Sequence, residues 1–296
     1  MLELVTSLLG WYACNAAFNV VNKEALNLWP HPWVVAWLQL LVGVLVAVPL
    51  WVLRARSPPR VSVAFLAREF GPIGALHAFG HGAQVLAFGE GSVFTANVVK
   101  ALEPVVGTLV GWLCLGRAPK PLATAALAPV VGGVVYAASK PGVGASLGDL
   151  ATRPAKAALL STVAFAFAKV LAKRQMTSAN KKERNFTAPN VYGLLTCSSC
   201  AALTLPAALL AGAVALPSRD ALRNVALSGF FYYASNEFSF RILDLLGPVS
   251  QAVANAAKRV FVLAAAVAFL GETVTPRKLH GSAIALGGVL AYGLAR

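Results

Sequence analysis

Residues 248–271 read PVSQAVANAAKRVFVLAAAVAFLG, an apolar stretch with two adjacent cations, Lys258 and Arg259, at its middle. A helix that spans a bilayer needs roughly 20 mostly apolar residues. An ionised side chain near the bilayer centre costs at least roughly 2.5 kcal/mol, so such residues normally face a protein-lined cavity. No acidic residue lies within four positions of either cation. The stretch therefore predicts a spanning helix that presents two positive charges to a cavity.

A second apolar stretch, VFTANVVKALEPVVGTLVGWLCLG at residues 93–116, places Lys100 at membrane depth and Glu103 one helical turn later. A lysine near a helix end can extend to the headgroups, and Lys and Glu three residues apart can neutralise each other. Neither explanation fits Lys258 and Arg259, which apolar or small residues flank on both sides. We therefore interpret Lys100, Lys258 and Arg259 as one anion site.

Composition places the chain among integral membrane proteins. Hydrophobic residues make up 58% of the chain and charged residues 12%, whereas about a quarter of the residues are charged in a typical soluble domain. A net charge of +14 would favour a nucleic-acid partner for a soluble protein, but Lys and Arg occur here in short clusters between apolar runs. Such clusters are typical of loops that face anionic lipid. We expect membrane lipid and no nucleic acid among the partners.

Hydropathy predicts an all-α integral membrane protein with ten transmembrane helices. The connections are short, and the polar, basic segment 173–188 is interpreted as a loop. The expected spans are residues 4–27, 32–53, 64–88, 92–115, 121–139, 153–172, 189–215, 222–245, 248–270 and 277–295.

An internal repeat relates the two halves of the chain. Leu-Gly followed by Gly-Gly-Val occurs at residues 115–134 and again at 270–289, with the same spacing. The fourth and ninth spans therefore correspond, and an odd number of crossings per unit inverts the second copy in the membrane. This predicts two five-helix inverted-topology repeats, 1–139 and 140–296, which form one transport domain and bring the cations of both halves to its midplane.

The third span carries polar groups at membrane depth. His77 and His81 lie one turn apart, with Gln84 on the same face. Two histidines could bind a metal, but no third ligand is evident, so we expect neither metal nor cofactor. Hydrogen bonding to an anion or to a neighbouring helix suits them better. We assign His81 to the site and a structural role to His77.

The eighth span combines a charged ladder with smaller polar groups. Glu237, Arg241 and Asp244 are spaced so that they can pair along one helix face. Lys169 on the sixth span lies near the basic loop, and we expect it to extend to the headgroups. Hydroxyl and amide groups that could line a cavity are found at Tyr232, Tyr233, Ser235 and Asn236.

Several stretches resemble the plastid phosphate translocators, the triose-phosphate/phosphate translocator family of the drug/metabolite transporter superfamily. They are WYACNAAFNVVNK at 11–23, LHAFGH at 76–81, SVFTANVVKALEPVV at 92–106, LAPVVGGV at 127–134 and GPVSQAVANAAKRVFV at 247–262. The resemblance runs end to end and implies a ten-helix strict antiporter of the inner plastid envelope or of a plastid-derived organelle membrane. Such antiporters exchange inorganic phosphate for phosphorylated three-, five- or six-carbon metabolites. The chain shows no cleavable signal before its first apolar helix, as expected of a trimmed mature form.

The resemblance also implies site residues. Lys100, Lys258 and Arg259 match the family's phosphate-binding cations, and His81 matches a site histidine. The family's substrate-contacting tyrosine falls on Ser235, and its small hydroxyl position falls on Gln84, so the preferred metabolite stays open among triose phosphate, 3-phosphoglycerate, phosphoenolpyruvate and sugar phosphates. The expected substrate-binding residues are Lys100, Lys258, Arg259, His81, Gln84, Ser235 and Tyr232.

Two other functions are compatible with these features. A nucleotide-sugar transporter shares the superfamily and the repeat, although the adjacent Lys258-Arg259 pair with Lys100 favours the phosphate translocators. A membrane enzyme acting on lipid phosphates would need clustered carboxylates for a metal or a general base. Glu103 and Glu237 are far apart in sequence. We therefore expect a transporter rather than an enzyme, and a monomer.

Overall fold

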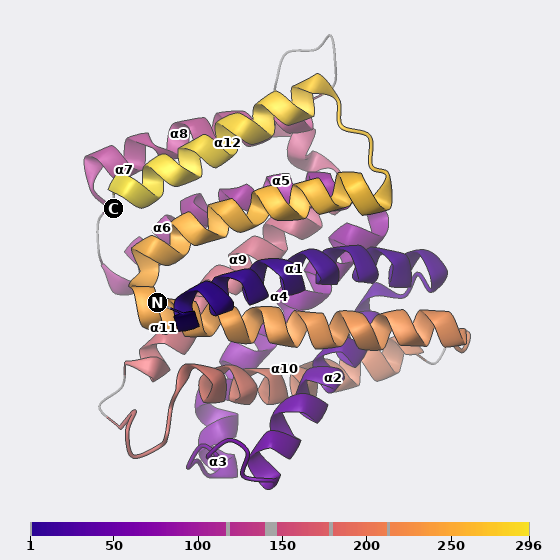
Figure 1. The fold of residues 1–296 in the computed structure, drawn as a ribbon, viewed down its shortest axis with the longest axis vertical. Coiled ribbons are helices and arrows are strands. Elements are labelled where there is room, and N and C mark those ends of the chain that lie inside the picture. The colour runs from indigo at the N-terminus through magenta and orange to yellow at the C-terminus, as the bar shows by residue number, and fades with distance from the viewer. Residues whose placement is uncertain (1, 117–118, 140–146, 178–179, 212–213, 296) are drawn as a thin grey trace.

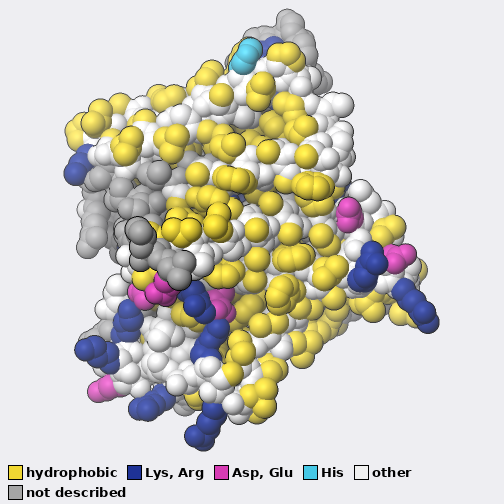
Figure 2. Space-filling view, in the orientation of Figure 1, with side chains coloured by type: hydrophobic (Ala, Val, Ile, Leu, Met, Phe, Trp, Pro, Cys, Tyr) yellow, Lys and Arg dark blue, Asp and Glu magenta, His cyan; other side chains and the backbone are white. Residues whose placement is uncertain are grey.

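All regular secondary structure in the described part of the chain is helical. The computed structural model describes residues 2–116, 119–139, 147–177, 180–211 and 214–295, and these ranges contain no strand. The helices run side by side across the molecule, and both termini lie at the same edge (Figure 1). Hydrophobic side chains are spread over the central face seen in Figure 2, whereas charged side chains gather in its lower part and at its edges. The predicted all-α fold is confirmed.

Six segments of the described chain are long and apolar enough to cross a membrane: Glu3–Leu28, Pro32–Val52, Val93–Leu113, Pro121–Ala138, Arg153–Met176 and Ala188–Ala211. The predicted spans 222–245 and 248–270 fall within α11 (Arg219–Leu270), and 277–295 falls within α12 (Pro276–Ala295). The predicted span 64–88 runs from α3 (Val63–Phe65) through a π-helical turn into α4 (Gly71–Glu90). The elements are α1 (Leu2–Leu28), α2 (Pro32–Val52), α3 (Val63–Phe65), a π-helical turn (Leu66–Phe70), α4 (Gly71–Glu90), α5 (Val93–Val99), a 3-10 turn (Lys100–Leu102), α6 (Glu103–Leu115), α7 (Pro121–Ala125), α8 (Leu127–Ala138), a 3-10 turn (Leu147–Ala151), α9 (Arg153–Met176), α10 (Ala188–Ala211), α11 (Arg219–Leu270) and α12 (Pro276–Ala295).

The element α11 contains two predicted spans, 222–245 and 248–270, in 52 helical residues. A straight helix of that length would extend roughly 78 Å, more than twice the ~30 Å thickness of the hydrocarbon layer. Figure 1 shows instead that α11 doubles back, so that its second arm runs beside α5. Helix α1 contacts both arms, because Tyr12 donates to the carbonyl of Ala254 at 2.8 Å and Asn15 donates to the hydroxyl of Ser235 at 3.1 Å.

The fourth predicted span is interrupted at its centre. Helix α5 ends at Val99, and a 3-10 turn separates it from α6. Pro104 has no N–H, so the carbonyl of Lys100 accepts from the N–H of Glu103, three residues on. The predicted span 92–115 thus consists of two helices joined by a short turn, and its segment Val93–Leu113 is long and apolar enough to cross a membrane. Interrupted helices expose backbone groups at membrane depth, which is tolerated where the groups line a cavity.

The glycine pairs of the predicted repeat meet where α8 packs against α12. A Cβ on Gly133 would lie 2.6 Å from the carbonyl oxygen of Gly281, and a Cβ on Gly288 would lie 2.8 Å from the nitrogen of Val130. One glycine of each pair thus permits close backbone approach. The other glycine of each pair has no described atom within 4 Å of such a Cβ. The predicted boundary between the repeats lies between residues 139 and 140, and residues 140–146 lie outside the described residues.

Candidate functional site

A cavity of about 90 Å³ lies between α1, α4, α9, α10, α11 and the interrupted segment α5–α6. It can hold several water molecules or a small polar ion. The charged side chains that line it are Lys100, Glu103, Lys169, Lys258 and Arg259. Amide, hydroxyl and imidazole groups complete the polar part of the wall, from Asn15, Asn19, His77, Gln84, Asn97, Thr162, Tyr232 and Asn236.

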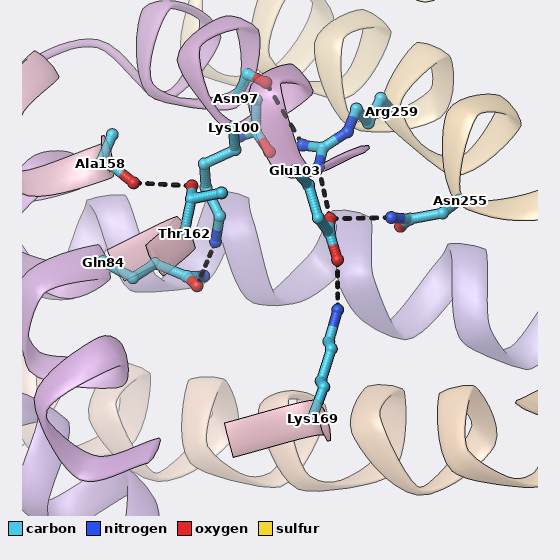
Figure 3. Close-up of polar contacts among 9 residues, drawn as sticks. All are labelled: Gln84, Asn97, Lys100, Glu103, Ala158, Thr162, Lys169, Asn255 and Arg259. Atoms are coloured by element: carbon cyan, nitrogen blue, oxygen red, sulfur yellow. Dashed lines mark hydrogen bonds and ion pairs between the residues drawn. The ribbon is translucent and has the colours of Figure 1, made fainter. Parts of the chain in front are cut away.

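Glu103 is at the centre of the charge network (Figure 3). Its Oε2 accepts from the guanidinium of Arg259 at 2.8 Å and from the amide of Asn255 at 2.9 Å. Its Oε1 contacts the ammonium of Lys169. The pairing of Glu103 with Lys100 that the sequence allowed does not form, because Lys100 turns toward α4. The carboxylate instead bridges the two halves of the chain.

Arg259 uses both arms of its guanidinium. One nitrogen binds Glu103, and the other donates to the backbone carbonyl of Asn97 at 3.3 Å. Asn97 lies at the end of α5, just before the 3-10 turn. The break in the fourth span therefore places a backbone acceptor, a lysine and a carboxylate around one arginine.

The two lysines predicted for the site meet neutral partners. Lys100 contacts the side-chain oxygen of Gln84 and lies 5.3 Å from the ring centre of Phe165. Lys258 lies 4.7 Å from the ring centre of Trp11. Aromatic rings and amide oxygens stabilise a cation without cancelling its charge. Among the described contacts, neither lysine forms an ion pair with a carboxylate.

Exposure increases from the arginine outward. The side chain of Arg259 is 6% exposed, that of Glu103 27% and that of Lys169 53%. The cavity thus becomes more open from Arg259 toward Lys169.

The first residues of α5 are held from outside the cavity. Glu272, just after α11, accepts from the N–H groups of Val93 and Phe94 at 2.7 and 2.9 Å, which holds α5 against the end of α11.

The prediction that Lys169 extends to the lipid headgroups was wrong. Lys169 instead lines the cavity and contacts Glu103. Its place on α9 is more than 60 residues from Glu103 in sequence, so no local spacing revealed the pair. The signal that could have revealed it was the membrane-embedded carboxylate itself, which needed a cationic partner.

The sequence analysis assigned His81 to the site and a structural role to His77, but in the structure His77 lines the cavity and His81 does not. His77 lines the cavity, where its Nδ1 lies 3.1 Å from the hydroxyl of Ser199 and its Nε2 lies 3.3 Å from the hydroxyl of Tyr232. His81 is fully buried away from the cavity and stacks on the ring of Tyr232 at 3.9 Å. Neither nitrogen of His81 has a hydrogen-bond partner among the described residues. His81 therefore packs against the cavity wall from behind, on the ring of Tyr232.

Of the remaining predicted site residues, two line the cavity and one does not. Gln84 and Tyr232 line the cavity. Ser235 does not, since it is 1% exposed and accepts a hydrogen bond from Asn15. The next residue, Asn236, lines the cavity instead. One step along α11 rotates a side chain by about 100°, which is enough to move it from the wall into a helix contact.

The charged ladder of the eighth span forms only in part. Glu237 pairs with Arg241 at 2.8 Å, as the spacing predicted, and also with Arg56 from the segment after α2 at 2.6 Å. Asp244 pairs with Lys181 at 3.4 Å rather than with Arg241. These groups connect α11 to two loops and are separate from the cavity.

A family profile and several curated relatives all relate this chain to phosphate translocators. The sequence profile of the Triose-phosphate Transporter family matches residues 2–293. A phosphoenolpyruvate/phosphate translocator of rice is 29% identical over 95% of this chain and 69% of its own length. A xylulose 5-phosphate/phosphate translocator of Arabidopsis thaliana is 30% identical over 96% of this chain and 68% of its own length. A triose phosphate/phosphate translocator of Brassica oleracea is 28% identical over 97% and 70%.

A solved crystal structure shares the fold. It superposes with a TM-score of 0.60 and 18% identity, and the match covers 98% of this chain and 94% of the other. The family profile covers nearly the whole chain, and the helices and the cation-lined cavity agree with it. The chain therefore belongs to the Triose-phosphate Transporter family and is a membrane transporter rather than an enzyme.

Proposed function

We propose that this transporter is a strict antiporter that exchanges inorganic phosphate for phosphorylated three-, five- or six-carbon metabolites. The single observation that carries the proposal is the cavity in which Lys100, Lys169, Lys258 and Arg259 face one carboxylate, Glu103. Among these described groups the cations outnumber the carboxylate by three. The printed names of the relatives, each a translocator of phosphate and a phosphorylated metabolite, support the same substrate class.

The chemistry of the site suits a phosphate group. A phosphate monoester carries a charge of about −1.5 to −2 at pH 7 and offers three acceptor oxygens. The planar fork of Arg259 can bind two of those oxygens, whereas Lys100 and Lys258 act as point charges. In this arrangement the phosphate replaces Glu103 as the acceptor for Arg259 and shields the two lysines.

Coupling follows from the excess positive charge. An unpaired buried charge costs several kcal/mol per ion, even after the protein relaxes. An empty carrier that occludes its cavity must bury the excess charge, whereas a loaded carrier does not. Each 1.36 kcal/mol of added barrier slows a step tenfold. The loaded carrier therefore crosses the membrane readily and the empty carrier rarely, which produces exchange.

A two-fold architecture suits alternating access. We propose ten membrane crossings arranged as two inverted repeats of five, 1–139 and 140–296. Support comes from the repeated glycine motif, the contact of α8 with α12 and the position of both termini at one edge (Figure 1). An inverted repeat lets one half rock against the other around a midplane site. The proposed unit is a monomer.

The choice of metabolite depends on the neutral part of the wall. The lining amides Asn15, Asn19 and Asn236 can hydrogen-bond the hydroxyl groups of a sugar phosphate. Gln84 is engaged by Lys100, and Ser235 faces away from the cavity. The relatives named above are chloroplast proteins, and we propose the inner plastid envelope as the location.

Exchange in liposomes tests the proposal. Purified protein is reconstituted into liposomes preloaded with phosphate, triose phosphate, 3-phosphoglycerate, phosphoenolpyruvate or hexose phosphate, and uptake of labelled phosphate is measured. Uptake that depends on one or more of these internal substrates is the expected result. Uptake that a nucleoside monophosphate drives instead would assign the site to nucleotide-sugar transport.

A further inference from the structure

Lys169 is a cation of the cavity wall to which the proposed function gives no role beyond its positive charge. It lies on α9, whereas Lys100 and Arg259 lie on the segments that the repeat relates. It contacts the Oε1 of Glu103, and more than half of its side chain is exposed. Figure 3 shows it on the opposite side of Glu103 from Arg259.

The carboxylate of Glu103 divides its oxygens between two cations. Oε1 contacts Lys169, and Oε2 accepts from Arg259 and Asn255. A carboxylate oxygen offers an arginine the same acceptor chemistry as a phosphate oxygen. Glu103 therefore competes with a bound phosphate for the guanidinium of Arg259. What becomes of Glu103 when the phosphate arrives determines how strongly it competes.

We propose that Lys169 is a positioning residue that holds Glu103 while a phosphate occupies Arg259. The inference rests on the proposed function of the cavity. When Arg259 is taken, Glu103 keeps one cation, Lys169, through an oxygen that the phosphate does not displace. Lys100 and Lys258 are not placed for this task, since Lys100 contacts Gln84 and Lys258 lies over Trp11.

Removing the charge of Lys169 has two linked consequences. Glu103 then depends on Arg259 for its charge pairing, so that a phosphate must leave the carboxylate with the neutral Asn255 alone. The apparent affinity for phosphate falls. The excess positive charge of the empty cavity also falls by one, so the empty carrier occludes more easily. Weaker binding and a larger leak are thus expected together.

Two other roles for Lys169 make different predictions. If Lys169 binds the substrate directly, its substitution lowers the affinity for phosphate whether or not Glu103 is present. If Lys169 only ties α9 to α6, its substitution lowers stability and the amount of active protein but leaves KM unchanged. A double-mutant cycle with Glu103 separates these cases, because it isolates the term that the two side chains share.

The experiment measures uptake of labelled inorganic phosphate into liposomes with and without internal phosphate. The variants are Lys169→Gln, Lys169→Met, Lys169→Arg, Glu103→Gln and the double variant Glu103→Gln/Lys169→Gln. Lys173→Gln is the matched control, because Lys173 lies one turn further along α9, is exposed and does not line the cavity. Thermal unfolding in detergent reports whether each variant is folded.

We expect Lys169→Gln and Lys169→Met to raise KM about fivefold, which corresponds to about 1 kcal/mol for a half-exposed ion pair. Uptake into empty liposomes rises in the same variants, whereas Lys169→Arg and Lys173→Gln match the wild type. In the Glu103→Gln background, Lys169→Gln changes KM by less than about twofold, or about 0.4 kcal/mol.

An equal rise in KM in the Glu103→Gln background would overturn the inference and make Lys169 a direct substrate ligand. An unchanged KM and an unchanged leak in both neutral variants would also overturn it. Failure of the wild-type protein to exchange phosphate is a separate result, which would instead contradict the proposed function.

Discussion

Arg259→Lys tests whether the guanidinium fork, rather than its charge alone, binds phosphate. Arg259 is 6% exposed and directs one nitrogen at Asn97 and another at Glu103, so two acceptors already lie within reach of its fork. A lysine keeps the positive charge but presents one nitrogen in place of two. The substitution therefore removes one hydrogen bond and leaves the net charge of the cavity unchanged.

The expected loss follows from that single bond. A hydrogen bond to a charged group contributes about 1.5–3 kcal/mol. At 1.36 kcal/mol per tenfold change, the ratio of maximal rate to KM for phosphate exchange falls about 10-fold to 150-fold. Removal of the charge as well, in Arg259→Gln, lowers the ratio further.

The assay is the initial rate of labelled phosphate uptake into phosphate-loaded liposomes. Arg241→Lys is the matched control, because Arg241 is on the same helix, pairs with Glu237 and does not line the cavity. It is expected to keep the wild-type rate. An Arg259→Lys protein within about threefold of the wild type, a difference of about 0.65 kcal/mol, would refute a two-oxygen role for the arginine.

The remaining predictions concern the frame around the site. Gly133→Ala places a Cβ 2.5 Å from the nitrogen of Ala285, so it lowers stability by about 1–3 kcal/mol. Gly132→Ala, which meets no described atom within 4 Å, is the control and keeps the melting temperature in detergent. Pro104→Ala restores an N–H to the interrupted segment, favours a continuous helix and turns Lys100 away from Gln84; exchange falls while thermal stability does not. Unchanged exchange in Pro104→Ala would show that the break does not position Lys100.

Three of the four described cations that line the cavity were predictable from the sequence. Lys258 and Arg259 stand inside an apolar run with no acid nearby, and the cost of such charges in a membrane points to a cavity. Lys100 lies at membrane depth in a second apolar run, and the internal repeat independently relates that run to the first. All three line the cavity of the structure. This inference needed only the sign and depth of each residue, which the sequence contains.

The orientation of side chains was not predictable. His77 and His81 lie one turn apart, and their places depend on how α4 rotates against α10 and α11, which contacts distant in sequence decide. Lys169 was placed at the headgroups because its partner, Glu103, is on another helix. The break at Lys100 was predictable in principle, since Pro104 stands within the apolar run and cannot donate a backbone hydrogen bond.

The central claim is that the cations of the cavity prevent the empty carrier from crossing the membrane. The most direct measurement compares uptake of labelled phosphate into liposomes that contain phosphate with uptake into liposomes that contain none, at equal protein content. If the empty state costs at least about 1.4 kcal/mol more than the loaded state, uptake without internal phosphate is below about a tenth of the loaded rate. Equal uptake in the two preparations would contradict the claim.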